Sequence, residues 1–107
     1  MEGLELISFN IISSVGMAKS NYIESMKIAE KGDFNLANEK IKEGDKFIDQ
    51  AHNAHSELIQ QEASGNCVTP NILLMHAEDQ LISAETTKIM SIEIIKLNKR
   101  IHSLENK

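Results

Sequence analysis

The sequence has no tryptophan, one tyrosine and three phenylalanines, so aromatic residues make up only 4% of its 107 positions. Its apolar content comes instead from isoleucine, leucine, alanine and methionine, a mix that is typical of helices packed on helices and not of β-sheets. A chain of this length holds one hydrophobic core and is too short for a two-lobed enzyme with a deep cleft. We therefore expect a single all-α domain over residues 1–107.

Cysteine is nearly absent as well. Cys67 is the one cysteine of the chain, which excludes an internal disulfide. It lies between Asn66 and Val68 in a stretch that we expect to form a loop. Because no histidine or other base stands near it in the sequence to activate a thiol, we do not expect Cys67 to be a nucleophile.

Basic residues are also in short supply, with 11 Lys and Arg against 16 Asp and Glu, for a formal net charge of -5. A nucleic-acid partner requires clustered basic side chains, so we expect none. The start of the chain is acidic, with Glu2 and Glu5, and no window approaches the roughly 20 apolar residues that cross a bilayer. These features predict a cytoplasmic protein.

Apolar residues recur every three or four positions, which is the spacing of amphipathic helices. The first helix is expected over about residues 4–31, followed by Gly32 as its stop and Asp33 as the N-cap of a second helix over about 33–63. The short turn predicts that the two helices are antiparallel. The second helix carries an unbroken seam for packing on other helices: Phe34, Ala37, Ile41, Gly44, Ile48, Ala51, His55 and Leu58.

A third helix is expected over about residues 70–104, with the Thr69 hydroxyl as its cap and Pro70 at its first position. Its apolar residues lie on three sides, formed by Leu74, Leu81, Ile92 and Ile95, by Ile94, Leu97, Ile101 and Leu104, and by Ile72, Met75, Ile82 and Ile89. A helix that is apolar on several sides needs more neighbours than two. The sequence therefore predicts an antiparallel three-helix bundle that self-associates around its third helix.

One polar pair interrupts the apolar start of this helix. His76 precedes Asp79 by three residues, so the two side chains share a face. Because Met75 and Ala77 flank His76, we expect apolar surroundings that keep its ring uncharged and nucleophilic. A hydrogen-bonded core histidine without chemistry would show the same pattern. In a symmetric oligomer around this helix, copies of Asp79 would converge and would need protons or a cation.

The other histidines are weaker candidates. His52 and His55 stand at metal-ligand spacing with Asp49 nearby, but a dimetal site in a helical bundle needs two acid-x-x-His motifs and two further glutamates. The residue three before His76 is Leu73, so only one such motif exists. We expect no metal at His52 or His55, and we expect His102, near the end of the chain, to be solvated.

Residues 74–81, together with 50–52 and 58–65, resemble the lactose/cellobiose-type enzyme IIA of the bacterial phosphoenolpyruvate-dependent sugar phosphotransferase system. The resemblance covers nearly the whole chain and implies a homotrimer with the third helices around the three-fold axis. It implies that His76 takes a phosphoryl group from the phosphocarrier HPr on Nε2 and passes it to a cysteine of the IIB component, during uptake of a β-linked disaccharide. It also implies that Asp79 of three subunits shares a divalent cation, expected to be Mg²⁺. The membrane is reached only indirectly, through the permease.

Two residues beside His76 depart from the pattern of that family. Glu78 stands where many members have glutamine, and Gln80 stands where others often have histidine. Because residues i and i+2 face different sides of a helix, we expect Glu78 to be turned away from His76 or engaged by a cation. With Met75, these two residues are the candidate neighbours of the active site.

Two other interpretations stay open at this point. A histidine phosphotransfer domain of two-component signalling is also helical and is also built on one exposed histidine. That family typically has lysine three residues after the histidine, followed by glycine, where this chain has Asp79 and Gln80. The other interpretation is a structural trimer in which His76 has no chemistry.

Overall fold

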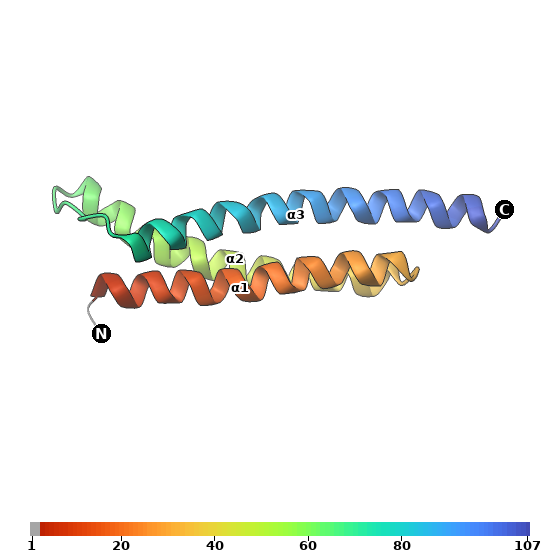
Figure 1. The fold of residues 1–107 in the computed structure, drawn as a ribbon, viewed down its shortest axis with the longest axis horizontal. Helices are drawn as coiled ribbons and strands as arrows, with labels where there is room; N and C mark the ends of the chain where they lie inside the picture. The colour runs from red at the N-terminus through yellow and green to blue at the C-terminus, as the bar shows by residue number, and fades with distance from the viewer. Residues whose placement is uncertain (1–2) are drawn as a thin grey trace.

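Three long α-helices make up the computed structural model, which describes residues 3–107 (Figure 1). Helix α1 spans Gly3–Glu30, α2 spans Phe34–Ala63 and α3 spans Ile72–Glu105. Neighbouring helices in the chain run antiparallel, and the rod that they form measures 61 × 22 × 19 Å. The predicted all-α, antiparallel three-helix fold is confirmed.

The turn between α1 and α2 follows from two residues. Gly32 has a φ of 93°, a left-handed conformation that a side chain disfavours. Asp33 then caps α2, because its Oδ1 accepts a hydrogen bond from the backbone N–H of Leu36 at 3.1 Å. The predicted stop and the predicted cap of this turn are both confirmed.

His102 of α3 closes this turn from the other side. Its Nε2 donates to the backbone carbonyl of Glu30 at 3.2 Å, and its ring meets Phe34 edge to face at a centroid distance of 5.4 Å. The expectation that His102 is solvated is therefore wrong. Helix α3 does not fray before this residue, and its length brings the imidazole level with the α1–α2 turn, where a free carbonyl accepts its proton.

The connection between α2 and α3 corrects the predicted start of the third helix. Asn71 caps α3, because its Oδ1 accepts from the backbone N–H of Leu74 at 2.8 Å, and the helix begins at Ile72. Thr69 and Pro70 precede the helix instead of starting it. The reason is that asparagine caps helices better than threonine does, so the later residue takes the role.

The connecting loop itself is exposed. Its backbone is held by Glu62, whose Oε2 accepts from the N–H of Val68 at 2.6 Å. Cys67 lies in this loop and is exposed, so the loop expected around it is confirmed.

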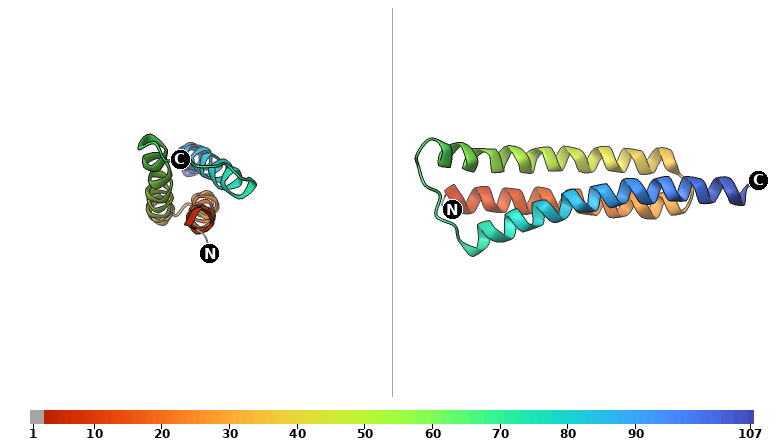
Figure 2. Two further views of the ribbon diagram at one scale, coloured as in Figure 1. Left: turned by 90° about the vertical axis from the view of Figure 1, so that its left-hand side faces the viewer. Right: turned by 90° about the horizontal axis from the view of Figure 1, so that it is seen from above.

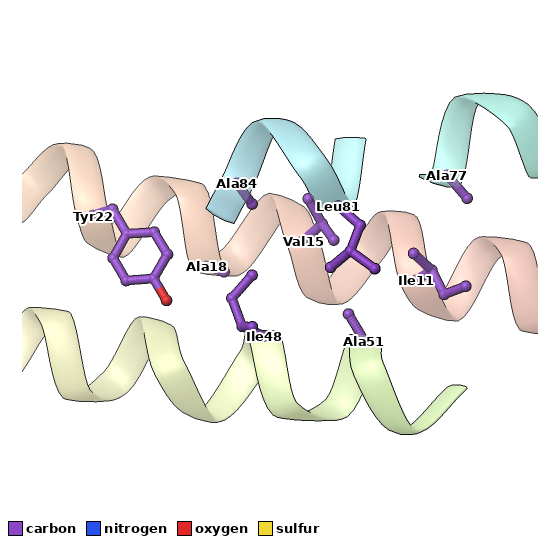
Figure 3. Close-up of a cluster of buried hydrophobic side chains, with 9 residues drawn as sticks. All are labelled: Ile11, Val15, Ala18, Tyr22, Ile48, Ala51, Ala77, Leu81 and Ala84. Atoms are coloured by element: carbon purple, nitrogen blue, oxygen red, sulfur yellow. The ribbon is translucent and has the colours of Figure 1, made fainter. Parts of the chain in front are cut away.

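Helix α1 lies at the centre of the packing. It contacts both other helices along its length, whereas α2 and α3 contact each other much less and diverge toward the end that carries their connecting loop (Figure 2). Alanines at the helix contacts let the backbones approach closely (Figure 3). The largest buried cluster consists of Ile11, Val15, Ala18, Tyr22, Ile48, Ala51, Ala77, Leu81 and Ala84.

Tyr22 joins all three helices. Its side chain is fully buried, and its hydroxyl donates to Oδ1 of Asp45 on α2 at 2.7 Å. The same Asp45 oxygen lies 3.0 Å from Nζ of Lys88 on α3. Burial, and then the hydrogen bond to the Asp45 carboxylate, raise the pKa of the Tyr22 hydroxyl.

Helix α3 is only partly covered by its own chain. Leu74, Ala77, Leu81 and Ile95 are buried toward α1 and α2. Large apolar side chains on the opposite side are between 53% and 85% exposed, and we call this side the outer face of α3: Ile72, Met75, Ile82, Ile89, Met90, Leu97 and Leu104. The prediction that two neighbouring helices do not cover the third is confirmed. Within residues 3–107, no helix is long and apolar enough to cross a bilayer.

Candidate active site

His76 lies in the second turn of α3 and points away from the core. Leu74 and Ala77 are buried against the other helices, and the helical turn between them places the His76 side chain in solvent. The apolar surroundings expected from its sequence neighbours are absent within one chain, because Ala77 faces the core and does not cover the ring. A reactant can therefore reach the imidazole of His76.

Asp79 follows one turn later and is also exposed. It lies on the outer face of α3, between Met75 and Ile82, which are 61% and 64% exposed. In residues 3–107 no three His, Cys, Asp or Glu side chains lie close enough together to hold a metal ion. Asp79 therefore belongs to no such group within one chain, and its carboxylate oxygens are ligands of the kind that Mg²⁺ and Ca²⁺ prefer.

Glu78 turns toward α2. Its Oε1 lies 3.0 Å from Nε2 of His55, which is half-buried. An ionised carboxylate can only accept a hydrogen bond. Nε2 of His55 is therefore the protonated ring nitrogen, and it donates this hydrogen bond to Glu78. The expectation that Glu78 is turned away from His76 agrees with this contact. Gln80, the other residue that departs from the family pattern, is half-buried.

A second pair of the same kind lies further along the two helices. Nε2 of His52 donates to Oε1 of Glu85 at 2.7 Å, and the two side chains are about half exposed. Both histidines of α2 therefore bind glutamates of α3, and neither shares a cluster with Asp49.

Sequence reasoning missed these two pairs because a contact between two helices depends on their register, although one known contact between α2 and α3 is enough to predict another. In an antiparallel pair of helices, a step forward on one matches an equal step back on the other. His55 lies ten residues after Asp45, and its partner Glu78 lies ten residues before Lys88, the partner of Asp45. The Asp45–Lys88 register therefore predicts the His55–Glu78 contact.

An open cavity of about 240 Å³ lies where α2 and α3 diverge. Its lining is mainly apolar, and the His55–Glu78 pair forms part of its wall. Met75, which is adjacent to His76 in the chain, also contributes. His76 itself is not part of the cavity lining.

Comparison with known proteins identifies the family. Residues 6–99 match the family of lactose/cellobiose-specific IIA subunits of the phosphotransferase system, or PTS. The lichenan-specific phosphotransferase enzyme IIA component of Bacillus subtilis is 37% identical over 100 residues, which covers 94% of this chain and 91% of that protein. The lactose-specific EIIA component of Lacticaseibacillus casei is 32% identical over 109 residues, which covers 99% and 95%.

A solved structure agrees with these relatives. The crystal structure of the cellobiose-specific enzyme IIA from Bacillus anthracis matches with a TM-score of 0.93 at 35% identity, over 96% of this chain and 94% of that one. The resemblance read from the residues around His76 is thereby confirmed. The chain belongs to the lactose/cellobiose-specific IIA family of the PTS.

Proposed function

We propose that this chain is a phosphocarrier that receives a phosphoryl group from phospho-HPr on Nε2 of His76. It passes the group to a cysteine of the IIB component, in the cytoplasm, during uptake of a β-linked disaccharide by a membrane permease. The observation that carries the proposal is the exposed imidazole of His76 on a helix of a PTS IIA subunit. Family membership favours this carrier over the two-component alternative.

Each transfer exchanges one bond to phosphorus for another. The lone pair of Nε2 attacks the phosphorus atom of phospho-HPr, the new N–P bond forms, and the bond to the donor breaks. In the second step a cysteine thiolate of IIB attacks, an S–P bond forms, and the N–P electrons return to the ring of His76. Such transfers depend on positioning and charge stabilisation, so a small helical protein with one accessible nucleophile is sufficient.

We also propose a homotrimer that buries the outer face of α3. The support is the set of exposed apolar side chains on that face, because apolar side chains gathered on one exposed face mark a site of protein–protein contact. In this arrangement Asp79 of each subunit lies near the axis. The three carboxylates would hold one divalent cation, expected to be Mg²⁺, which would offset their mutual repulsion.

The test of the phosphocarrier is direct. The protein is incubated with phosphoenolpyruvate, enzyme I and HPr, and intact mass spectrometry follows the gain of one phosphoryl group. We expect a label that is labile in acid and stable in base, as a phosphohistidine is. His76→Gln is expected to lose the label, whereas His52→Gln, which changes an exposed histidine of α2, is expected to keep it.

A competent donor makes a negative result decisive. The same HPr preparation is first shown to phosphorylate a lactose-specific relative. If the wild-type chain then takes no label, or if the His76→Gln variant takes as much as the wild type, the proposal is wrong.

A further inference from the structure

We propose that His55 is a positioning residue for phosphoryl transfer at His76, because it holds the negative charge of Glu78 against α2 and away from the incoming phosphoryl group. The inference rests on the proposed function. It concerns a residue on a different helix from the nucleophile, and it acts through Glu78 and not by touching the reacting atoms.

The side chain of Glu78 can reach back along α3. It follows His76 by two residues, which separates the two side chains by about 160° around the helix. Helical side chains lean toward the N-terminus, so the Glu78 carboxylate extends back along α3 to the level of the His76 turn. Rotation about its side-chain bonds can carry the carboxylate of a free glutamate only part of the way around the helix, toward the side of His76 or away from it.

A contact with His55 restrains the rotation of the Glu78 side chain. Glu78 is exposed, and its carboxylate accepts a hydrogen bond from Nε2 of His55 at 3.0 Å. Among residues 3–107, no lysine or arginine pairs with Glu78. His55 is half-buried on the seam of α2 and forms part of the cavity wall together with Leu58 and Leu74. Partial burial restricts the rotation of its ring. The contact therefore holds the carboxylate on the side that faces α2.

The phosphoryl group that approaches His76 is negatively charged. A phosphoryl group carries nearly two negative charges near neutral pH, and it must reach the imidazole of His76. A carboxylate that swings toward the side of His76 would repel this group more strongly than one that His55 holds on the side facing α2. By Coulomb's law in a well-solvated site, moving the Glu78 charge a few ångströms closer to the phosphoryl group slows the transfer by about twofold.

The His52–Glu85 pair provides a matched control. His52 and Glu85 form the same kind of pair between the same two helices, at 2.7 Å. Glu85 lies seven residues beyond Glu78, which is about two helical turns further from His76. His52→Ala therefore removes a comparable side-chain contact between α2 and α3 without releasing a negative charge near His76.

The experiment measures the rate of phosphoryl transfer from phospho-HPr to five proteins: wild type, His55→Ala, His52→Ala, Glu78→Gln and the double variant His55→Ala/Glu78→Gln. We expect His55→Ala to be slower by about twofold. We expect His52→Ala to match the wild type, and the double variant to match Glu78→Gln, because an uncharged side chain no longer needs to be held. Circular dichroism checks that all five are folded.

The outcomes separate the two proposals. If the wild type is labelled but His55→Ala is as fast, or if the double variant stays as slow as His55→Ala, the positioning role is wrong while the phosphocarrier stands. An equal loss in His52→Ala would also overturn it, because the effect would then belong to the helix contact and not to the charge. If the wild type takes no label from a competent HPr, the proposed function fails and this inference fails with it.

Discussion

At the scale of single residues, the contact between Tyr22 and Gly44 determines how closely α1 and α2 approach. A Cβ atom at Gly44 would lie 2.6 Å from Cε1 of Tyr22 and 2.9 Å from two further ring atoms. The ring is fully buried and its hydroxyl is bound to Asp45, so it has no room to move aside. Position 44 therefore requires glycine.

Gly44→Ala is expected to destabilise the fold by about 2 kcal/mol, because the overpacked ring forces the two helices apart. Thermal unfolding followed by circular dichroism measures the effect. Gly16→Ala is the control, since nothing lies within 4 Å of its Cβ position in α1 and alanine favours the helix by up to about 1 kcal/mol. Equal stability of the Gly44→Ala variant and the wild type would contradict the packing described.

Tyr22 also predicts a dependence of stability on alkaline pH. Its pKa is raised in the folded chain above the ordinary value of 10.0, so the unfolded chain loses this proton first as the pH rises. The stabilisation is complete below pH 10 and declines above it, by at most about 1.4 kcal/mol per pH unit. Urea unfolding at several pH values compares wild type with Tyr22→Phe. A stability difference between the two that stays constant above pH 10 would contradict the prediction.

At the scale of elements, the three helices could be predicted from sequence because each carries an apolar period and a stop signal. Gly32 and Asp33 determine one turn by conformation and capping, both of which are local properties. The start of α3 could not be placed by the same reasoning, because Thr69 and Asn71 both offer a capping oxygen. Only the geometry shows that Asn71 provides the cap.

Asn71→Ala is therefore expected to cost about 1 kcal/mol of stability, through loss of the bond to the Leu74 N–H. Thr69→Ala is the matched change, because the helix starts after it and we expect almost no effect. Chemical denaturation of both variants measures the difference. If Thr69→Ala is the more damaging of the two, the cap has been assigned to the wrong residue.

The contacts between elements were the hardest to predict. The position of His102 near the end of the chain predicts a solvated side chain, yet the length of α3 brings it to the α1–α2 turn. His55 and Glu78 are 23 residues apart in the sequence, and their pairing depends on the register between α2 and α3. The histidine and aspartate of the candidate site, in contrast, could be proposed from sequence because they share one helix face and resemble a family motif.

At the scale of the whole molecule, the outer face of α3 leads to a prediction about Asp79. In the proposed trimer, chelation of divalent cations is expected to lower the melting temperature of the wild type. Asp79→Leu is expected to remain a helical trimer and to lose this sensitivity, because apolar side chains pack at an axis without repulsion. Sedimentation equilibrium and thermal melting, each with and without EDTA, measure both properties.

Glu57→Leu, which removes an exposed carboxylate from α2, is the control and is expected to keep the sensitivity to chelation. If the Asp79→Leu variant dissociates into monomers, Asp79 does not have the role proposed for it. A wild type that sediments as a monomer at all concentrations would instead contradict the trimer itself.

Asp79 is the eighth residue of a 34-residue helix, so it lies near one end of a long rod. In the proposed trimer the three carboxylates can meet only if all subunits point the same way, since an inverted copy would carry its aspartate to the far end. Every His76 would then sit at one pole. The phosphoryl donor and the phosphoryl acceptor would then both approach the same end of the trimer, and at any one His76 the donor would have to leave before the acceptor could bind.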